Sequence, residues 1–279
     1  MRAIDCLHLG HERVICCWQV GDVLIDPGPT SCVDTLLAAL GDERPRALLL
    51  THIHLDHAGA SGTLVRRWPD LEVYVHERGA RHMAEPERLI DSATRLYGED
   101  MDRLWGQFEA VPDDRLRPLA GGERLRFGAD QFEVAYTPGH AYHHVSYLHG
   151  SGTAFVGDTG GVRIVPEGPV IPPTPPPDID LAAWRGSLGL IRAWQPERLA
   201  FTHFGASDDV EAQLGDLEAR LGDWAAVARE TDLDGFEASV RAELAGVSPP
   251  EVFAAYEQAV PFDQAFAGLR RYWEKHADG

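Results

Sequence analysis

One stretch of the sequence, residues 47–59, constrains the fold and the chemistry of the chain more than any other. Residues 47–50 are all apolar and predict a short buried strand. Four side chains of the kind that bind metals follow within six positions: His52, His54, Asp56 and His57. Buried polar groups need partners, and neutral imidazole and carboxylate are ligands of divalent transition metals. The stretch therefore predicts a metal site directly after a core strand.

Three more polar residues each follow an apolar run that predicts a strand. The runs and the residues are 134–136 with His140, 155–156 with Asp158, and 199–201 with His203. Loops at one edge of a rigid sheet are a common place to assemble a site. Seven candidate ligands are too many for one tetrahedral ion, but they suit two ions that share a carboxylate and keep open positions.

The remaining pattern alternates between strand-rich and helical segments. Strands are predicted at residues 4–9, 14–20, 23–25, 47–50, 72–75, 124–127, 131–136, 144–148, 153–156 and 199–201. Helices are predicted at residues 34–40, 59–68, 179–194, 210–229, 233–245, 249–258 and 262–276. No strand pattern follows residue 201, so we expect a first domain over residues 1–207 and a helical C-terminal subdomain over residues 208–279.

Two segments of the first domain interrupt its strands. Residues 77–111 predict a helical insertion, whose aromatic residues either pack into a core or form a lid over the metal site. Residues 166–177 contain seven prolines and predict either a stiff active-site loop or an extended surface spacer. The sequence leaves both pairs of alternatives open.

Charge and cysteine usage restrict the partners and the location. A formal net charge of −19 disfavours nucleic acids and anionic membranes, because both require a basic surface. No signal-peptide pattern and no apolar run of membrane-spanning length is present, so we expect a cytoplasmic protein. None of the four cysteines forms a C-x-x-C pair, and we expect reduced thiols: Cys6, Cys16, Cys17 and Cys32.

Taken as a set, these motifs resemble the metallo-β-lactamase fold hydrolases. They are the H-x-H-x-D-H cluster, the T-P-G-H turn at 137–140, the Gly157-Asp158 pair and the late Thr202-His203 pair. The resemblance implies an α/β fold, specifically an αββα four-layer sandwich of two packed mixed sheets flanked by helices. It implies that one metal is held by His52, His54 and His140, the second by Asp56, His57 and His203, and that Asp158 bridges them. It further implies that Asp26, in an early D-x-G turn, supports the metal loop.

The same resemblance favours one branch of the family. Asp158 stands where several true β-lactamases of this fold carry Cys, and His54 stands where flavodiiron relatives usually carry an acidic residue. RNA-processing relatives tend to have basic surfaces and extra domains, and this sequence predicts neither feature. The segment 137–144 is similar to the T-P-G-H-T-x-G-H/S turn of glyoxalase II-like thioesterases and lactonases. That alignment makes His144 a candidate support of the site and leaves His143 and His149 as surface or core residues.

We therefore expect a dinuclear metal-dependent hydrolase that attacks the carbonyl of a small ester, lactone or thioester with a metal-bridging hydroxide. Two divalent ions are expected, most simply zinc, with iron or manganese as alternatives. Asp56 and Asp158 are the expected metal-bound catalytic carboxylates, and Tyr97 of the insertion is the expected oxyanion donor.

Three other functions are compatible with the sequence. They are a mononuclear-iron sulfur dioxygenase, a phosphodiesterase on the same metal pair, and a non-catalytic protein stabilised by metal. The aromatic insertion and the Pro-rich segment predict a largely apolar pocket, and no basic cluster suited to glutathione is visible. The C-terminal helices either cover this pocket or form a homodimer interface.

Overall fold

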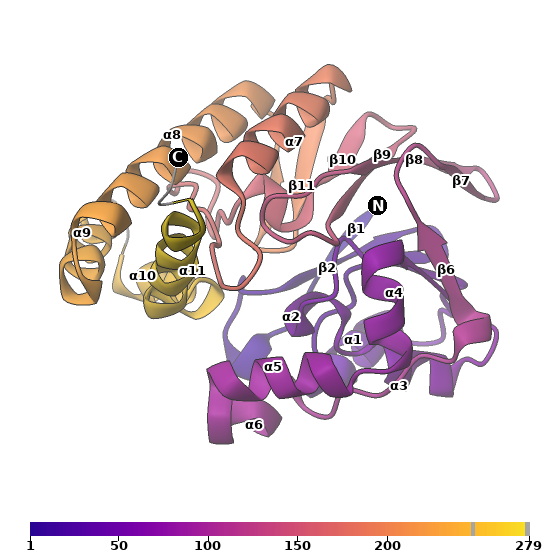
Figure 1. The fold of residues 1–279 in the computed structure, drawn as a ribbon. Helices are drawn as coiled ribbons and strands as arrows, with labels where there is room; N and C mark the ends of the chain where they lie inside the picture. Colours follow the sequence, from indigo (N-terminus) through magenta and orange to yellow (C-terminus); the bar gives the residue numbers. More distant parts are fainter. Residues whose placement is uncertain (247–248, 277–279) are drawn as a thin grey trace.

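Two mixed six-stranded sheets pack face to face in the computed structural model, which describes residues 1–246 and 249–276 (Figure 1). The first sheet contains, in spatial order, β1 (Arg2–Asp5), β2 (Cys16–Val20), β3 (Val23–Ile25), β4 (Ala47–Leu49), β5 (Glu72–His76) and β6 (Leu116–Leu119). The second contains β12 (Gly205–Ser207), β11 (Arg198–Phe201), β10 (Thr153–Phe155), β9 (Val145–His149), β8 (Asp130–Tyr136) and β7 (Arg124–Phe127). Strands β3 to β6 run parallel, as do β10 and β11.

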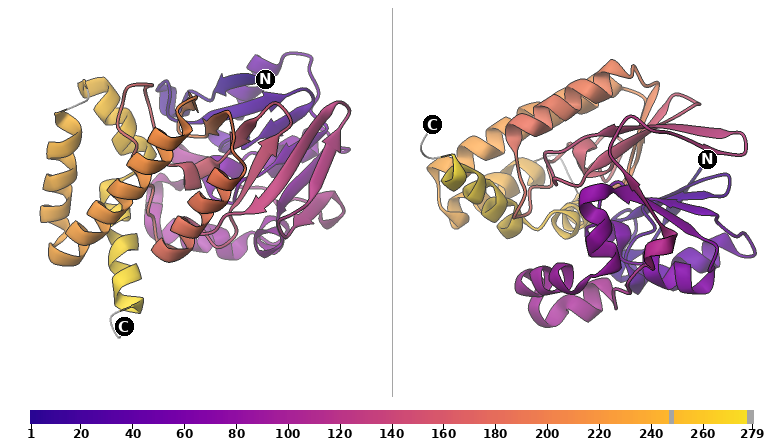
Figure 2. Two further views of the ribbon diagram at one scale, coloured as in Figure 1. Left: turned by 90° about the horizontal axis from the view of Figure 1, so that it is seen from above. Right: turned by 45° about the vertical axis from the view of Figure 1, so that its right-hand side comes forward.

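Helices cover the outer sides of both sheets (Figures 1 and 2). On the side of the first sheet lie α1 (Val33–Leu40), α2 (Leu55–Ala58), α3 (Ser61–Arg67), α4 (Glu77–Ala84), α5 (Glu87–Tyr97) and α6 (Met101–Trp105). On the side of the second sheet lie α7 (Leu181–Ala193) and α8 (Val210–Glu230), followed by α9 (Leu233–Ala245), α10 (Pro250–Ala259) and α11 (Phe262–Lys275). The predicted αββα sandwich with a helical C-terminal region is therefore confirmed.

The core between the sheets explains the apolar runs in β2 and β4. On β2, Cys16 and Trp18 face the inter-sheet core, whereas Cys17 faces the core beneath the helices. On β4, Leu49 faces the inter-sheet core and Leu48 faces the helices. Because side chains alternate along a strand and both faces of this parallel strand are buried, β4 requires an uninterrupted apolar sequence.

Acidic residues begin three of the helices of the second half. Asp180, Asp209 and Asp232 each accept a hydrogen bond from a backbone N–H in the first turn of α7, α8 and α9. A side-chain cap of this kind typically contributes about 1 kcal/mol to helix stability. The three helices accordingly begin within two residues of the positions that the sequence predicts.

Two strand predictions are wrong. The first predicted strand, 4–9, ends at Asp5, because Leu7 and Leu9 adopt positive φ angles of 50° and 55° in a turn. The absence of a strand after residue 201 is also wrong, because β12 pairs antiparallel with β11. This short strand has no apolar pattern, and it forms through backbone pairing at the edge of the sheet. The helix predicted at 59–68 corresponds to α3, and the short helix α2 that precedes it was not predicted.

The helical insertion and the C-terminal helices lie where the sequence places them. Residues 77–111 carry α4, α5 and α6. The division into domains at 207 and 208 stays a prediction, and residues 247–248 and 277–279 of the second part lie outside the described residues. Over the described part of the chain, no helix combines the length and the apolar character needed to cross a membrane.

The Pro-rich segment 166–177 is held in place by α11. The Thr174 hydroxyl donates a hydrogen bond to the Ala265 carbonyl at 3.1 Å. Gly268 lies so close to the segment that an added Cβ would collide with the Thr174 carbonyl oxygen and lie 2.8 Å from the Pro175 carbonyl carbon. Only a glycine allows α11 and this segment to approach so closely.

We predict that Gly268→Ala lowers the free energy of unfolding by about 1–3 kcal/mol, because the new methyl group forces α11 away from the Pro-rich segment. Gly215→Ala in α8 is the matched control, since nothing lies within 4 Å of the Cβ it would add. That substitution should raise stability by about 0.5–1 kcal/mol. Chemical unfolding of both variants measures the difference, and equal effects would contradict the close contact.

Candidate metal centre

The candidate ligands lie at the carboxyl ends of four strands. β4 leads to the cluster at 52–57, β8 to His140, β10 to Asp158 and β11 to His203. Because β8 and β10 both run antiparallel to β9, and β11 runs parallel to β10, these three strands end at the same edge of the second sheet. The sheet topology therefore gathers residues that lie up to about 150 positions apart in the chain.

A change of backbone conformation divides the cluster at 52–57 into two groups. His54 has an extended conformation and precedes α2, whereas Asp56 and His57 lie inside that short helix. Residues two positions apart in an extended segment point to the same side, so His52 and His54 stay together. The helical turn directs Asp56 and His57 toward His203.

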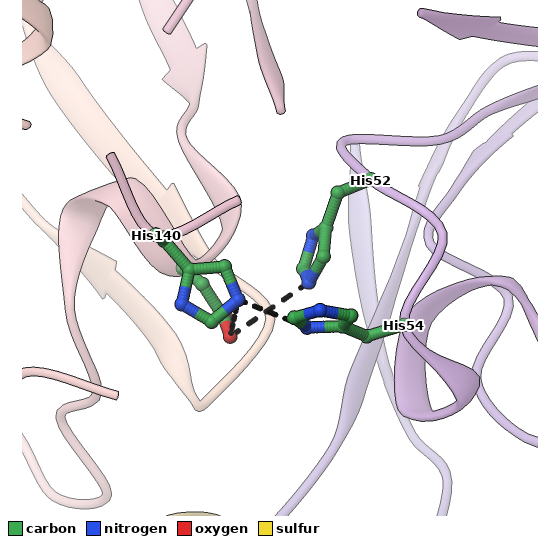
Figure 3. A group of neighbouring side chains, drawn as sticks. His52, His54 and His140 are labelled. Carbon is green, nitrogen blue, oxygen red and sulfur yellow. Dashed lines mark hydrogen bonds and ion pairs between the residues drawn. The ribbon is translucent and has the colours of Figure 1, made fainter. Parts of the chain in front are cut away.

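The first group consists of His52, His54, His140 and Asp158, whose ligand atoms all lie within 4.8 Å of one another. The Nε2 atom of His140 lies 3.0 Å from His54 Nδ1 and 3.3 Å from Asp158 Oδ2. The His52 Nε2 atom lies 3.9 Å from the same oxygen. Figure 3 shows the three rings pointing toward one another, with His52 and His54 on one side and His140 on the other.

The second group consists of Asp56, His57 and His203. The Asp56 Oδ2 atom lies 3.6 Å from His57 Nε2 and 3.2 Å from His203 Nε2. The Oδ1 atom of Asp158 lies 3.2 Å from His57 Nε2 and 3.6 Å from His203 Nε2. The two oxygens of Asp158 thus face different groups, which is the arrangement that a bridging carboxylate requires.

The donor atoms fit a pair of metal ions. Four buried atoms that point between these residues have no hydrogen-bond partner: His52 Nε2, His57 Nε2, His203 Nε2 and Asp158 Oδ1. The other ring nitrogens are held: His57 Nδ1 by Asp26, His140 Nδ1 by the Pro173 carbonyl and His203 Nδ1 by the Val14 carbonyl. Metal-binding histidines are commonly oriented in this way, with one nitrogen fixed by a carboxylate or carbonyl and the other free for the ion.

Asp26 supports this arrangement from behind. Its Oδ1 accepts the Thr51 backbone N–H at 2.8 Å, and its Oδ2 accepts the Thr51 and Thr202 hydroxyls, each at 2.7 Å. The same Oδ2 lies 2.8 Å from His57 Nδ1, and the residue is fully buried. The expectation that Asp26 supports the metal loop agrees with these contacts.

The electrostatic environment keeps the carboxylates ionised. Burial alone would raise the pKa of Asp158, but His57, His140 and His203 outweigh burial and hold that pKa well below its usual range. Burial would lower the pKa of His57, but Asp158 and Asp56 outweigh it and raise that pKa. Since metal ligands must be deprotonated, ions that bind here displace protons from such histidines.

A cavity of about 310 Å³ opens over both groups. Its wall is mostly apolar and comes from the insertion, the Pro-rich segment and the α10–α11 turn, for example Leu89, Leu96, Trp105, Pro175 and Val260. Among the described residues of this wall, Arg88 alone is an arginine or lysine. The Pro-rich segment thus lies at the site, which is the first of the two alternatives that the sequence leaves open.

The remaining predicted residues have different surroundings. Tyr97 lines the cavity, but its hydroxyl donates to Gln264 Oε1 at 3.3 Å, and its role as oxyanion donor stays a prediction. The buried His144 ring contacts the Thr137 hydroxyl at 3.0 Å and so braces the turn that carries His140. His149 lies away from the site.

Several residues of the cavity wall have no sequence signal. Gln258 and Gln264 reach it from α10 and α11, which lie outside every motif of the first domain. Their position depends on how the C-terminal helices pack against the sandwich. His143 also lines the cavity, although the sequence leaves it as a surface or core residue.

A family model of the metallo-beta-lactamase superfamily matches residues 21–203, which is more than half of the chain. The chain is 29% identical over 195 residues to the metallo-beta-lactamase fold-containing protein ST1585 of Sulfurisphaera tokodaii, a match that covers 68% of this chain and 71% of that protein. The crystal structure of ST1585 from Sulfolobus tokodaii has the same fold, with a TM-score of 0.72, 22% identity, and coverage of 96% of this chain and 97% of that one.

Two further relatives are informative. A hydroxyacylglutathione hydrolase of Aeromonas salmonicida is 31% identical over 137 residues, which are 49% of this chain and 41% of that enzyme. The chain therefore matches less than half the length of that hydrolase. The structure of TTHA1623 in a di-iron-bound form has a TM-score of 0.55 and 32% identity, and the match covers 71% of this chain and 92% of that one.

The fold, the His/Asp clusters and the family model together define the class of this protein. The chain belongs to the metallo-beta-lactamase superfamily. The resemblance inferred from the motifs is thereby confirmed, and the clustered residues fit a two-metal site.

We predict that His57→Ala lowers the metal content from about two ions per chain to about one, because His57 Nε2 belongs to the second group. His52→Ala is the matched variant, since it removes an imidazole from the first group and should spare the second ion. Elemental analysis of both proteins, together with titration of the apo forms, distinguishes the two sites. Equal loss of both ions in His57→Ala would contradict the assignment.

Proposed function

We propose that this protein is a dinuclear hydrolase that attacks the carbonyl carbon of a small ester, lactone or thioester and breaks its acyl C–O or C–S bond. The observation that carries the proposal is the position of Asp158, whose two oxygens face two separate groups of ligand atoms at the floor of one cavity. Divalent ions held by these groups would supply Lewis acidity and a hydroxide nucleophile near neutral pH.

Different residues of the chain would bind the two ions and the substrate. His52, His54 and His140 would hold one ion, Asp56, His57 and His203 the other, and Asp158 both. Asp56 and Asp158 also line the cavity, so both metal-binding carboxylates would lie beside the substrate. The apolar wall would bind the acyl or leaving group and limit the access of bulk water.

The relatives support a hydrolase and a metal pair. The hydroxyacylglutathione hydrolases are named for a hydrolytic reaction, and TTHA1623 is described in a di-iron-bound form. We infer two divalent ions here, most simply zinc, with iron and manganese as alternatives.

We do not infer a glutathione substrate. Recognition of the two carboxylates of glutathione favours several basic side chains, and the described cavity wall contributes one arginine. This composition of the cavity wall supports an uncharged substrate, and we infer an activity nearer to that of lactonases and esterases within the glyoxalase II-like branch.

The proposal is tested by elemental analysis followed by a substrate panel of lactones, aryl esters, thioesters and phosphodiesters, each assayed with zinc, iron and manganese. We expect about two ions per chain and hydrolysis of at least one carbonyl class, lost on chelation and restored by the metal. Asp158→Ala should abolish turnover. One iron per chain with uptake of O₂ would contradict the proposal and identify a sulfur dioxygenase. Turnover of phosphodiesters alone would identify a phosphodiesterase.

Tyr97 is proposed as a weak donor to the substrate. Because its hydroxyl already donates to Gln264, it must exchange that partner, and we expect Tyr97→Phe to lower kcat/KM by roughly 3- to 10-fold, the worth of one ordinary hydrogen bond. Gln264→Leu is the matched variant, because it frees the hydroxyl without removing it. An unchanged kcat/KM in Tyr97→Phe would leave Tyr97 as part of the wall only.

A further inference from the structure

His143 is a buried histidine of the cavity wall with no partner. His143 is only 4% exposed, yet it lines the cavity. The Nδ1 atom is shielded from solvent and has no hydrogen-bond partner. Among residues 1–246 and 249–276, no hydrogen bond or ion pair involves Nε2 of this ring either. Buried polar atoms in native proteins are rarely left in this state.

The other histidines of the site do not share this property. The candidate ligands His57, His140 and His203 each fix one ring nitrogen on a carboxylate or carbonyl and leave the other for a metal. His8, which also lines the cavity, has hydrogen-bond partners at both ring nitrogens. His143 belongs to neither group of ligand atoms. A role as metal ligand or as structural hydrogen-bonding residue therefore does not account for it.

The ring is packed directly against the first group of ligands. Its centroid lies 6.1 Å from that of His52, with the planes 13° apart, and 5.6 Å from that of His54, at 90°. Gly79 of α4 lies beside the ring, since a Cβ at that position would be in ordinary contact with His143 Cβ at 3.5 Å. The imidazole is thus held between α4 and the candidate metal centre, at the wall of the cavity.

The local turn also differs from the pattern that it resembles. In the T-P-G-H-T-x-G-H/S turn, the position of His143 is occupied by glycine, so this chain places an imidazole where that pattern has no side chain. Within the described residues, no carboxylate forms a hydrogen bond or an ion pair with the ring. A histidine in such surroundings is suited to donate a hydrogen bond from an N–H group and not to relay a proton.

Resting on the proposed function, we propose that His143 contacts the substrate, and that an N–H group of its neutral ring donates a hydrogen bond to the carbonyl oxygen of the ester, lactone or thioester. That oxygen gains negative charge in the transition state, so the hydrogen bond strengthens as the carbonyl carbon is attacked. The ring transfers no proton, and it holds the scissile carbonyl beside the first group of ligands. Unlike Tyr97, it needs to break no existing hydrogen bond to do so.

The test compares three variants of the metal-loaded enzyme on the best substrate of the panel. We expect His143→Leu to lower kcat by about 10²-fold and to change KM by less than about threefold, with an unchanged metal content. The amide N–H groups of Asn and Gln lie near the positions of Nδ1 and Nε2 of the histidine. Partial recovery in His143→Asn or in His143→Gln would therefore identify the donating nitrogen.

His149→Leu in β9 is the matched control. His149 contacts Asp130 at 3.1 Å and Ser151 at 2.9 Å, so its loss should lower Tm and leave kcat unchanged. His143→Leu should show the opposite result, with Tm within about 2 °C of the wild type or above it, because an unpaired polar group is removed.

Three results would overturn the inference. They are an unchanged kcat in His143→Leu, a loss of Tm like that of His149→Leu, and a loss of metal in proportion to the loss of activity. A wild-type protein that hydrolyses no carbonyl substrate would end the proposed function and this inference together. If the wild type hydrolyses a carbonyl substrate and His143→Leu has the same kcat, only this inference is wrong.

Discussion

The buried carboxylate of Asp26 joins the loops of both sheets at the candidate metal centre. It accepts hydrogen bonds from Thr51, which precedes the first histidines, and from Thr202, which precedes His203, and it orients the ring of His57. A fully buried carboxylate is stable only when such donors surround it. The same contacts that make Asp26 tolerable in the core therefore hold ligands from distant parts of the chain in one arrangement.

The sandwich and its additions contribute different parts of the site. All seven candidate ligands come from segments that follow strands of the two sheets. Most of the apolar cavity wall comes instead from the insertion, the Pro-rich segment and the turn between α10 and α11. Rigid strand ends suit ligands that must keep their distances, whereas helices packed on the sandwich can differ in shape without disturbing those ligands. The candidate ligands thus belong to the sandwich, and most of the cavity wall belongs to the additions.

Local patterns were sufficient for much of the fold. The apolar run of β4 reports burial on both faces, and the acidic caps of α7, α8 and α9 report where those helices begin. Prediction failed where pairing decided the structure. β12 has no apolar pattern and exists because its backbone pairs with β11, and the turn after Asp5 bends at Leu7 and Leu9, two residues that ordinarily favour extended or helical backbone.

The sequence by itself indicated the candidate metal ligands of this protein. The spacing of His52, His54, Asp56 and His57 after a core strand is a local property, and it indicates a metal site without knowledge of the rest of the chain. Only the tertiary structure placed Asp158 between the two groups, because each group combines side chains from both sheets. It alone revealed that His143 is buried without a partner, since burial and hydrogen bonding depend on contacts between segments that the order of residues does not record.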